Sequence, residues 1–307
     1  MTLTELRYIV AVAREKHFGR AAEACFVSQP TLSVSIKKLE KELDVRIFER
    51  GANEVSVTPL GEEIVRQAQS VIEQAAGIRE IAKRNKDPLT GALRLGVIYT
   101  IGPYLLPDLV HQAIERVPQM PLMLQENFTA RLLDMLRTGE LDCAIMAEPF
   151  PDTGLAMAPL YDEPFMVALP STHPLAKRKS ISAEELKEEK MLLLGTGHCF
   201  RDHVLEVCPE YARFSSEADG MRKTFEGSSL ETIKYMVASG MGLTVVPQLS
   251  VPAKPQAHVV YVPFAKPVPT RRVVLAWRRS FTRYEAIAAL RNVIYACPLK
   301  GVKRLTA

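Results

Sequence analysis

Residues 59–86 carry an apolar pattern that divides the chain into parts. Six small or apolar residues recur there with steps of four and three, namely Ile64, Ala68, Val71, Ala75, Ile78 and Ala82. This heptad repeat is typical of a helix that pairs lengthwise with another helix, and the helix would be about 42 Å long. The alternative is that these six residues form an apolar stripe that packs against the helix's own domain. We expect an N-terminal module over 1–58, a dimerisation helix with its hinge over 59–87, and a C-terminal part over 88–307.

The first 58 residues predict three helices followed by a small β-hairpin. Thr2 and Glu5 have the spacing of a capping box, and apolar residues follow at helical intervals. After a short alanine-rich helix, Ser28 is a natural N-cap for a third helix, with Pro30 in its first turn. The expected elements are helices over 2–16, 20–25 and 28–43 and strands over 45–50 and 55–58.

A short helix, a tight turn and a capped helix with small polar residues outside are typical of a winged helix-turn-helix, whose second helix enters the major groove of DNA. The side chains expected to contact DNA are Gln29, Pro30, Thr31, Ser33 and Lys37, with Arg50 at the tip of the wing. Charge does not carry this prediction, because residues 1–58 hold nine basic and eight acidic side chains. By pattern alone, a protein-binding helical module is the alternative.

From Ala92 onward, short apolar strands alternate with capped helices, which predicts an α/β arrangement. Strands are expected over 93–98, 122–125, 141–146, 165–169, 191–194, 243–246, 259–262 and 273–277, and helices from Gly102, Thr129, Ser182, Ser228 and Tyr284. Such sheets bind ligands where strands end and helix N-termini converge. Thr100 and Thr129 lie at two such ends, so both hydroxyls are candidates for one cleft, with ordinary N-capping as the alternative.

Five cysteines occur at positions 25, 143, 199, 208 and 297. Cys199 is distinguished by its neighbours His198, Arg201 and His203, because cationic groups raise the reactive thiolate fraction of a cysteine. Cys208 follows nine positions later. A disulfide needs Cα atoms about 4.4 to 6.8 Å apart, whereas nine helical steps span about 13 Å. A redox switch through this pair would therefore remodel the segment, and the alternative is that both thiols are apolar core residues.

Several classes of protein are not indicated. The longest apolar runs are shorter than the roughly 18 residues of a membrane span, and the first residues do not resemble a signal peptide. We therefore expect a cytoplasmic chain with no membrane partner. The sequence shows no phosphate-binding glycine loop, nucleophile elbow or zinc-ligand spacing. We predict no cofactor, no metal and no enzymatic activity; a thiol peroxidase is the enzyme class that Cys199 leaves open.

Motifs along the whole chain resemble those of one family. Phe18-Gly19-Arg20-Ala21-Ala22, Ser28-Gln29-Pro30-Thr31-Leu32-Ser33 and Phe48-Glu49-Arg50 resemble the N-terminal domain of LysR-type transcriptional regulators. Within that family, the chain is similar to OxyR-type hydrogen peroxide sensors through Gly102-Pro103-Tyr104-Leu105-Leu106-Pro107, Gly197-His198-Cys199 with Arg201-Asp202, and Cys208.

The resemblance implies a winged helix-turn-helix, a long linker helix and a periplasmic-binding-protein-like regulatory domain. That domain would consist of two α/β subdomains, about 88–162 with 266–307, and 163–265. The resemblance also implies a homotetramer, a dimer of dimers joined through linker helices and regulatory domains. Its partners would be promoter DNA, hydrogen peroxide, RNA polymerase and a cellular thiol reductant, and it would mainly activate oxidative-stress genes.

The resemblance further assigns roles to the two cysteines. Cys199 would be oxidised by peroxide to a sulfenic acid, and Cys208 would resolve it as a disulfide. The implied peroxide pocket comprises Thr100, Thr129, His198, Arg201 and Asp202. The resemblance also suggests that one arginine of the pair Arg271-Arg272 activates the thiol. The rival within the family is a regulator that responds to a small organic ligand in the α/β cleft, with incidental cysteines.

Overall fold

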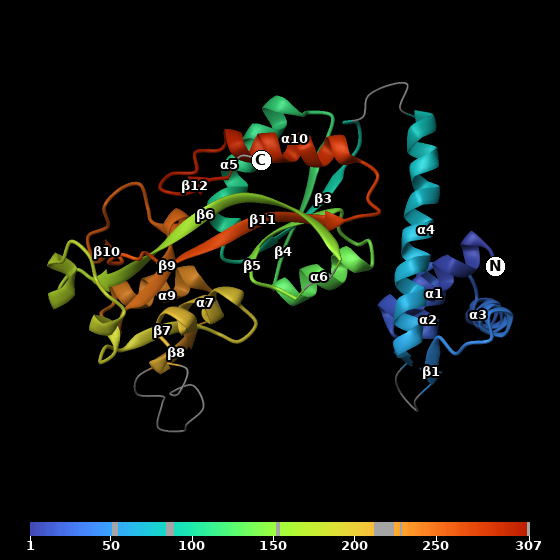
Figure 1. Ribbon diagram of the computed structural model, residues 1–307, viewed down its shortest axis with the longest axis horizontal. Helices are drawn as coiled ribbons and strands as arrows, with labels where there is room; N and C mark the ends of the chain where they lie inside the picture. Colours follow the sequence, from blue (N-terminus) through green and yellow to red (C-terminus); the bar gives the residue numbers. More distant parts are fainter. Residues whose placement is uncertain (51–54, 84–88, 152–153, 212–223, 228, 306–307) are drawn as a thin grey trace.

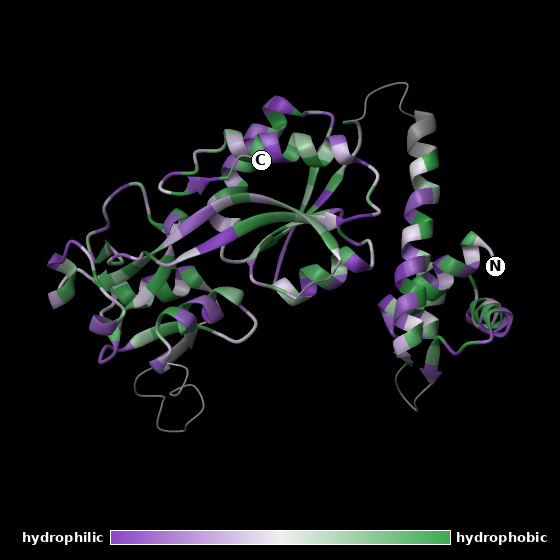
Figure 2. Ribbon diagram, in the orientation of Figure 1, coloured by the Kyte–Doolittle hydropathy of each residue, from purple (hydrophilic) through white to green (hydrophobic). Residues whose placement is uncertain are grey.

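The computed structural model describes the chain from 1 to 307 except residues 51–54, 84–88, 152–153, 212–223, 228 and 306–307. Its elements surround three clusters of buried apolar side chains, one in the N-terminal module and two in the C-terminal part. Apolar residues concentrate along the strands of the large sheet (Figure 2). Among the described residues, no helix combines the length and apolar character needed to cross a membrane.

The N-terminal module has the predicted order, with α1 (Leu3–Glu15), α2 (Phe18–Ala24), α3 (Gln29–Leu43), β1 (Phe48–Arg50) and β2 (Val55–Val57). The Thr2 hydroxyl accepts from the Glu5 N–H and the Glu5 carboxylate accepts from the Thr2 N–H, so the predicted capping box begins α1. Ser28 caps α3 by accepting from the Thr31 N–H. β1 and β2 pair antiparallel as the predicted wing, whose turn at 51–54 lies outside the described residues.

The linker helix α4 (Pro59–Lys83) packs beside α1 and extends beyond the N-terminal module (Figure 1). Ile64, Ala68 and Val71, from the first half of the heptad stripe, pack on the buried cluster of that module. Farther along, Ile78 keeps 69% of its surface exposed. Packing on its own domain therefore accounts for the first half of the stripe. The expected helix residues 84–86 lie outside the described part of the chain.

A second contact joins α4 to the C-terminal part. The Glu73 carboxylate forms an ion pair with Arg278 and accepts a hydrogen bond from the Ser280 hydroxyl. Nη1 of the buried Arg278 also donates to the carbonyl oxygens of Leu136 and Leu141. One guanidinium thus connects the linker helix to the loop that follows α6.

The C-terminal part is built on an eight-stranded sheet of order β10-β6-β11-β5-β3-β4, in which β9 and β12 also pair with β6. Its strands are β3 (Leu93–Ile98), β4 (Leu122–Asn127), β5 (Cys143–Glu148), β6 (Leu155–Pro170), β9 (Thr244–Pro247), β10 (Val259–Pro263), β11 (Thr270–Arg278) and β12 (Lys303–Arg304). β3 runs parallel to β4 and β5, and β6 runs antiparallel to its partners. The first half of β6 pairs with β11 and the second half with β9 and β10, so one strand spans both halves of the sheet.

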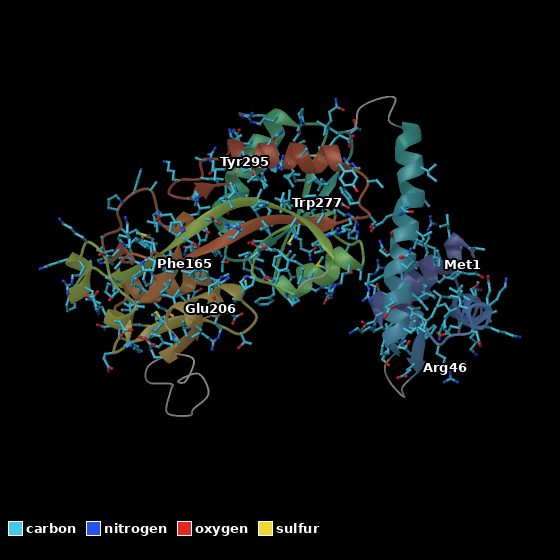
Figure 3. All side chains as sticks on the ribbon, in the orientation of Figure 1. Met1, Arg46, Phe165, Glu206, Trp277 and Tyr295 are labelled. Carbon is cyan, nitrogen blue, oxygen red and sulfur yellow. The ribbon has the colours of Figure 1, made fainter. Side chains whose placement is uncertain are left out.

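Two α/β subdomains share this sheet. Helices α5 (Gly102–Arg116), α6 (Thr129–Arg137) and α10 (Tyr284–Ala296) enclose the buried cluster around β3 and β5. Helices α7 (Cys199–Val207) and α9 (Leu230–Ala238), with the parallel pair β7 (Met191–Leu194) and β8 (Thr224–Gly227), enclose the cluster that contains Phe165 (Figure 3). The predicted α/β fold class with two subdomains is confirmed.

β6 begins ten residues earlier than the strand expected from Phe165. This stretch contains Pro159 and Pro164, and proline is unfavourable inside a strand because it cannot donate to the ladder. The structure accommodates Pro159 next to a register shift between Val273 and Val274 of β11, where β6 carries an extra residue.

The α-helix expected from Ser182 is wrong. Only one 3₁₀ turn, η2 (Glu184–Leu186), forms there. The N-cap of this turn is Ala183, which makes no side-chain capping bond, although the Glu185 carboxylate accepts from the Ser182 N–H and hydroxyl. The sequence after Leu186 is Lys-Glu-Glu-Lys, which supplies no apolar face to bury, so the helix does not continue. The helix expected from Ser228 begins instead at Leu230 with Ser229 as its N-cap, and Ser228 lies outside the described residues.

Candidate redox site and nucleic-acid interface

Three helices of the C-terminal part begin close to one small cavity. α5 follows Thr100-Ile101, α6 starts at Thr129, and α7 starts at the half-buried Cys199. None of their N-cap residues, Ile101, Phe128 and His198, makes a side-chain capping hydrogen bond. The first N–H groups of each helix carry partial positive charge and lack an intrahelical acceptor. Cys199 lies in the first turn of α7, beside the N–H groups of that helix.

The cavity has a volume of about 10 Å³ and is lined by Ile98, Tyr99, Thr100, Asn127, Phe128, Thr129, Gly197, His198 and Cys199. This is space for about one water-sized molecule. Thr129 Oγ1 is buried and has no hydrogen-bond partner among the described residues. The structure thus brings together four of the predicted site residues, Thr100, Thr129, His198 and Cys199. The imidazole of His198 is buried and packs edge-on against Phe128, with ring centres 4.8 Å apart.

Arg271 lies directly behind the cavity. It is 2% exposed, and its Nη1 donates to Thr100 Oγ1 at 2.7 Å while its Nη2 donates to the Thr100 carbonyl at 3.0 Å. Its Nε donates to Glu163 Oε2 at 2.9 Å, and its guanidinium carbon lies 5.1 Å from the centre of the Phe200 ring. Because a guanidinium has only donors, Thr100 Oγ1 is the acceptor and its own hydrogen is directed elsewhere.

The neighbouring Arg272 is exposed and pairs with Asp162, so Arg271 is the member of the pair that belongs to the site. Burial alternates along β11 from Thr270 to Val273. That period of two was a usable signal, since it places Arg271 on the same buried face as Val273.

Three predicted neighbours of Cys199 point away from the cavity. Arg201 is buried, and its Nη1 donates to the Leu194 carbonyl at 2.9 Å, at the end of β7. Asp202 is exposed in the first turn of α7. Neither side chain lines the cavity, because successive residues of a helix point about 100° apart.

His203 is buried, and its Nε2 lies 2.8 Å from the Glu148 carbonyl. Burial lowers the pKa of His203 below its usual value of 6.5. The expectation that His203 supplies positive charge near the thiol is therefore wrong, since its neutral form is favoured.

Cys208 caps the C-terminal end of α7, fully buried in the second subdomain. Burial, with a smaller effect of the Glu210 carboxylate, raises the pKa of the Cys208 thiol to about 12. The two thiols are unbonded, as are the other three in the chain. They stand at opposite ends of α7, about 13 Å apart along the axis, whereas a disulfide requires Cα atoms within about 7 Å. Bond formation therefore requires α7 to lose its helical form.

The N-terminal end of α3 presents most of the predicted DNA contacts to solvent. Gln29, Pro30, Thr31 and Lys37 are exposed, and Ser33 is half-buried. Arg50 ends β1 at the wing, and its side chain lies outside what the structure describes.

A larger cavity of about 380 Å³ lies between the subdomains, lined by Tyr99, Thr100, Pro103, Tyr104, Glu126, Phe128, His198, Ser229, Leu230 and Glu231. Across it, the Tyr104 hydroxyl donates to Glu231 Oε1 at 2.6 Å, and Lys234 Nζ donates to the same oxygen at 2.8 Å. In the described part of the chain, no three His, Cys, Asp or Glu side chains are grouped to hold a metal ion.

A three-helix module with a wing, a long linker helix and a two-subdomain α/β domain define a bacterial transcription regulator, and two family models match the corresponding segments. The LysR-family regulatory helix-turn-helix model matches residues 3–62, and the LysR substrate-binding domain model matches residues 86–296. The chain belongs to the LysR family. It is accordingly a transcription regulator of the cytoplasm and not an enzyme.

Individual relatives match over nearly the whole chain. The DNA-binding transcriptional dual regulator OxyR of Escherichia coli K12 is 39% identical over 94% of this chain and 94% of its own length. A hydrogen peroxide-inducible genes activator of Haemophilus influenzae is 36% identical over 99% of this chain and 100% of its own. The solved structure of full-length OxyR C199D from Pseudomonas aeruginosa superposes with a TM-score of 0.83 at 51% identity, covering 100% of this chain and 98% of that one.

Proposed function

We propose that the chain is a hydrogen-peroxide-sensing regulator, mainly an activator of oxidative-stress genes, switched by a reversible disulfide between Cys199 and Cys208. The observation that carries the proposal is the cavity beside Cys199, which at about 10 Å³ has room only for a molecule close to water in size and is lined by the hydroxyl-bearing Thr100 and Thr129. The Haemophilus influenzae relative, a hydrogen peroxide-inducible genes activator, supports the same function.

Oxidation begins with the Cys199 thiolate at the N-terminus of α7. Its sulfur attacks one peroxide oxygen, the O–O bond breaks, and the departing hydroxide takes a proton to leave as water. Cys199 becomes a sulfenic acid, so sulfur is oxidised by two electrons and peroxide is reduced by two. The Thr100 hydrogen, directed away from Arg271, is available to a peroxide oxygen, and Thr129 offers a second hydroxyl that has no partner within the described part of the chain. His198 completes the cavity wall.

The second step couples this chemistry to conformation. The Cys208 thiol loses its proton and attacks the Cys199 sulfur, the S–O bond breaks, and a second water leaves as the disulfide forms. In the reduced fold Cys208 is buried, with a pKa of about 12, and stands at the far end of α7. The step therefore needs Cys208 to leave the core of its subdomain and α7 to unwind. A cellular thiol reductant would restore the helix by thiol–disulfide exchange.

The rearrangement of the regulatory domain would change DNA binding through the oligomer that the chain forms. We propose a DNA-binding module over 1–58, a linker over 59–87 and a regulatory domain over 88–307, divided into subdomains at about 88–162 with 266–307, and 163–265. In a dimer of dimers, exposed linker residues such as Ile78 would meet a partner helix. Gln29, Pro30, Thr31, Ser33, Lys37 and Arg50 would contact promoter DNA, and RNA polymerase would be recruited to the oxidised form.

The test is to treat the reduced full-length protein with one equivalent of hydrogen peroxide and map its thiols by peptide mass spectrometry. A rapid bond between Cys199 and Cys208 is the expected result. Cys199→Ser should bind DNA and lose every peroxide-dependent change in the DNA footprint, whereas Cys143→Ser, which removes a buried thiol elsewhere, should respond normally. Unreacted thiols in the wild-type chain would overturn the proposal.

The larger cavity between the subdomains favours a second candidate, a regulator that responds to a small organic ligand. Calorimetry with metabolites on the reduced protein distinguishes the two. Saturable binding of a metabolite that alters the DNA footprint without peroxide would favour the regulator that responds to a small organic ligand.

A further inference from the structure

Phe26, in the turn between α2 and α3, is the most exposed large apolar side chain that the structure describes. Its side chain is 95% exposed, and the next in this order is Tyr235 at 75%. A phenylalanine has no polar group to gain from water, so burial of its large apolar surface is the usual outcome. The exposed ring is therefore available to a partner that would cover it.

The backbone at Phe26 is also unfavourable for its side chain. Its φ of 57° is in the left-handed region. The Phe26 N–H donates to the Glu23 carbonyl at 3.0 Å and the Val27 N–H to the Ala22 carbonyl at 3.0 Å. This is the Schellman motif at the end of α2, in which the residue at the position of Phe26 is usually glycine. A bulky residue with positive φ is a genuine outlier, and such outliers gather at functional sites.

The location of Phe26 identifies the partner. Phe26 precedes the N-cap Ser28 by two residues, so their Cα atoms are at most about 7.6 Å apart. A helix-turn-helix reaches base edges with the N-terminal residues of its second helix. Val34, one turn into α3, is a second exposed apolar side chain there at 66%. In the major groove, the apolar feature that distinguishes one base from the others is the C5-methyl group of thymine.

We propose that Phe26 is a sequence-specific DNA contact whose ring packs on a thymine methyl group beside the bases faced by Gln29 and Thr31. The contact rests on the proposed docking of α3 in the major groove. It adds an apolar element to a contact set that is otherwise polar or basic apart from Pro30. It also explains why the turn carries phenylalanine where glycine would relieve the backbone.

The test compares variants of the full chain on duplexes selected from a random library by the wild-type protein. Phe26→Asn keeps a residue that tolerates the left-handed conformation but removes the ring. We expect it to bind the selected duplex about 5- to 30-fold more weakly, with an unfolding temperature equal to or above that of the wild type. Leu3→Asn is the matched control, because Leu3 is an exposed apolar residue near Met1, whose amino group pairs with Glu42 at the far end of α3.

Replacing each thymine in turn by deoxyuridine locates the contact. One such replacement should weaken binding by the wild type and leave Phe26→Asn unaffected. Equal binding by Phe26→Asn and the wild type would overturn the Phe26 contact alone, as would a loss that is the same on a scrambled duplex. If the wild type selects no duplex, the proposed DNA recognition by α3 fails with it.

Discussion

Arg271 donates from Nη1 to Thr100 Oγ1 over 2.7 Å, although 171 positions separate the two residues in the chain. The same guanidinium is fixed from behind by Glu163, which is fully buried and also accepts from the Leu249 N–H at 2.8 Å. The ion pair thus sets the direction of a hydroxyl that lines the cavity next to Cys199. We propose that Arg271 acts through Thr100, as a positioning residue for the proposed reaction with peroxide.

Replacing Arg271 with lysine should slow oxidation of Cys199 while preserving the fold. An ammonium group keeps a charge for Glu163 but lacks the planar fork that reaches Thr100 and Glu163 together. We expect the rate of Cys199 oxidation to fall about tenfold, measured by rapid mixing with peroxide and thiol trapping. Arg272→Lys, at the exposed neighbour, is the control. An unchanged rate in Arg271→Lys would show that the Thr100 hydroxyl does not need this donor.

Thr129→Val should slow the oxidation of Cys199 without lowering the stability of the fold. Thr129 Oγ1 is buried without a partner in the described structure, so exchanging the hydroxyl for a methyl group costs no internal hydrogen bond. We expect an equal or higher unfolding temperature together with slower sulfenic acid formation at Cys199. If the oxidation rate matched that of the wild type, Thr129 would be a wall of the cavity and not a donor to peroxide.

The features predicted correctly from the sequence are those set by local interactions. The capping box of Thr2 and the cap of Ser28 are visible in a few consecutive residues, and both helix starts follow the prediction. The meeting of Thr100 and Thr129 at one cavity was also predicted, because each lies near the start of a helix in an α/β pattern. Cys199 was added to them only by the resemblance, since no helix was expected from that residue and α7 was missed. Resemblance then supplied the roles that spacing alone left open.

What the sequence left undecided depends on contacts between distant segments. Arg271 and Arg272 are identical neighbours, and their roles differ because Glu163 and Thr100 meet only the buried face of β11. Arg201 was grouped with Cys199 by proximity in sequence, whereas the helical phase of α7 turns it toward Leu194. The early start of β6 was not expected from the sequence, and the added stretch includes Pro159, which pairs with Val274 next to the register shift of β11.

Glu73→Gln should loosen the contact between the linker helix and the regulatory domain. Glu73 is the acidic partner of Arg278, whose Nη1 is already engaged by two carbonyl groups. An uncharged amide leaves the largely buried guanidinium without its counter-charge, at a cost of about 1 to 3 kcal/mol. Hydrogen exchange should accelerate in the second half of α4, while the peroxide reactivity of Cys199 stays at the wild-type level. Glu62→Gln, in the first turn of α4, serves as the control. If the amide groups in the second half of α4 exchanged equally slowly in both variants, the Glu73 contact would not hold the helix.

Acidification should destabilise the regulatory domain through His203. Its Nε2–H donates to the Glu148 carbonyl, and burial lowers its pKa in the folded state, so the unfolded chain binds a proton more readily. Stability is therefore fully present above the unfolded pKa of about 6.5 and falls as the pH drops toward the folded value. The slope cannot exceed about 1.4 kcal/mol per pH unit for one proton.

Other groups titrate in the same range, so the quantity to measure is the difference between wild type and His203→Gln in the free energy of unfolding from pH 7.5 to 5. Gln retains an N–H donor for Glu148 but takes up no proton, and its stability should decline less steeply on acidification. Parallel curves would show that His203 is protonated equally easily in the folded and unfolded chains.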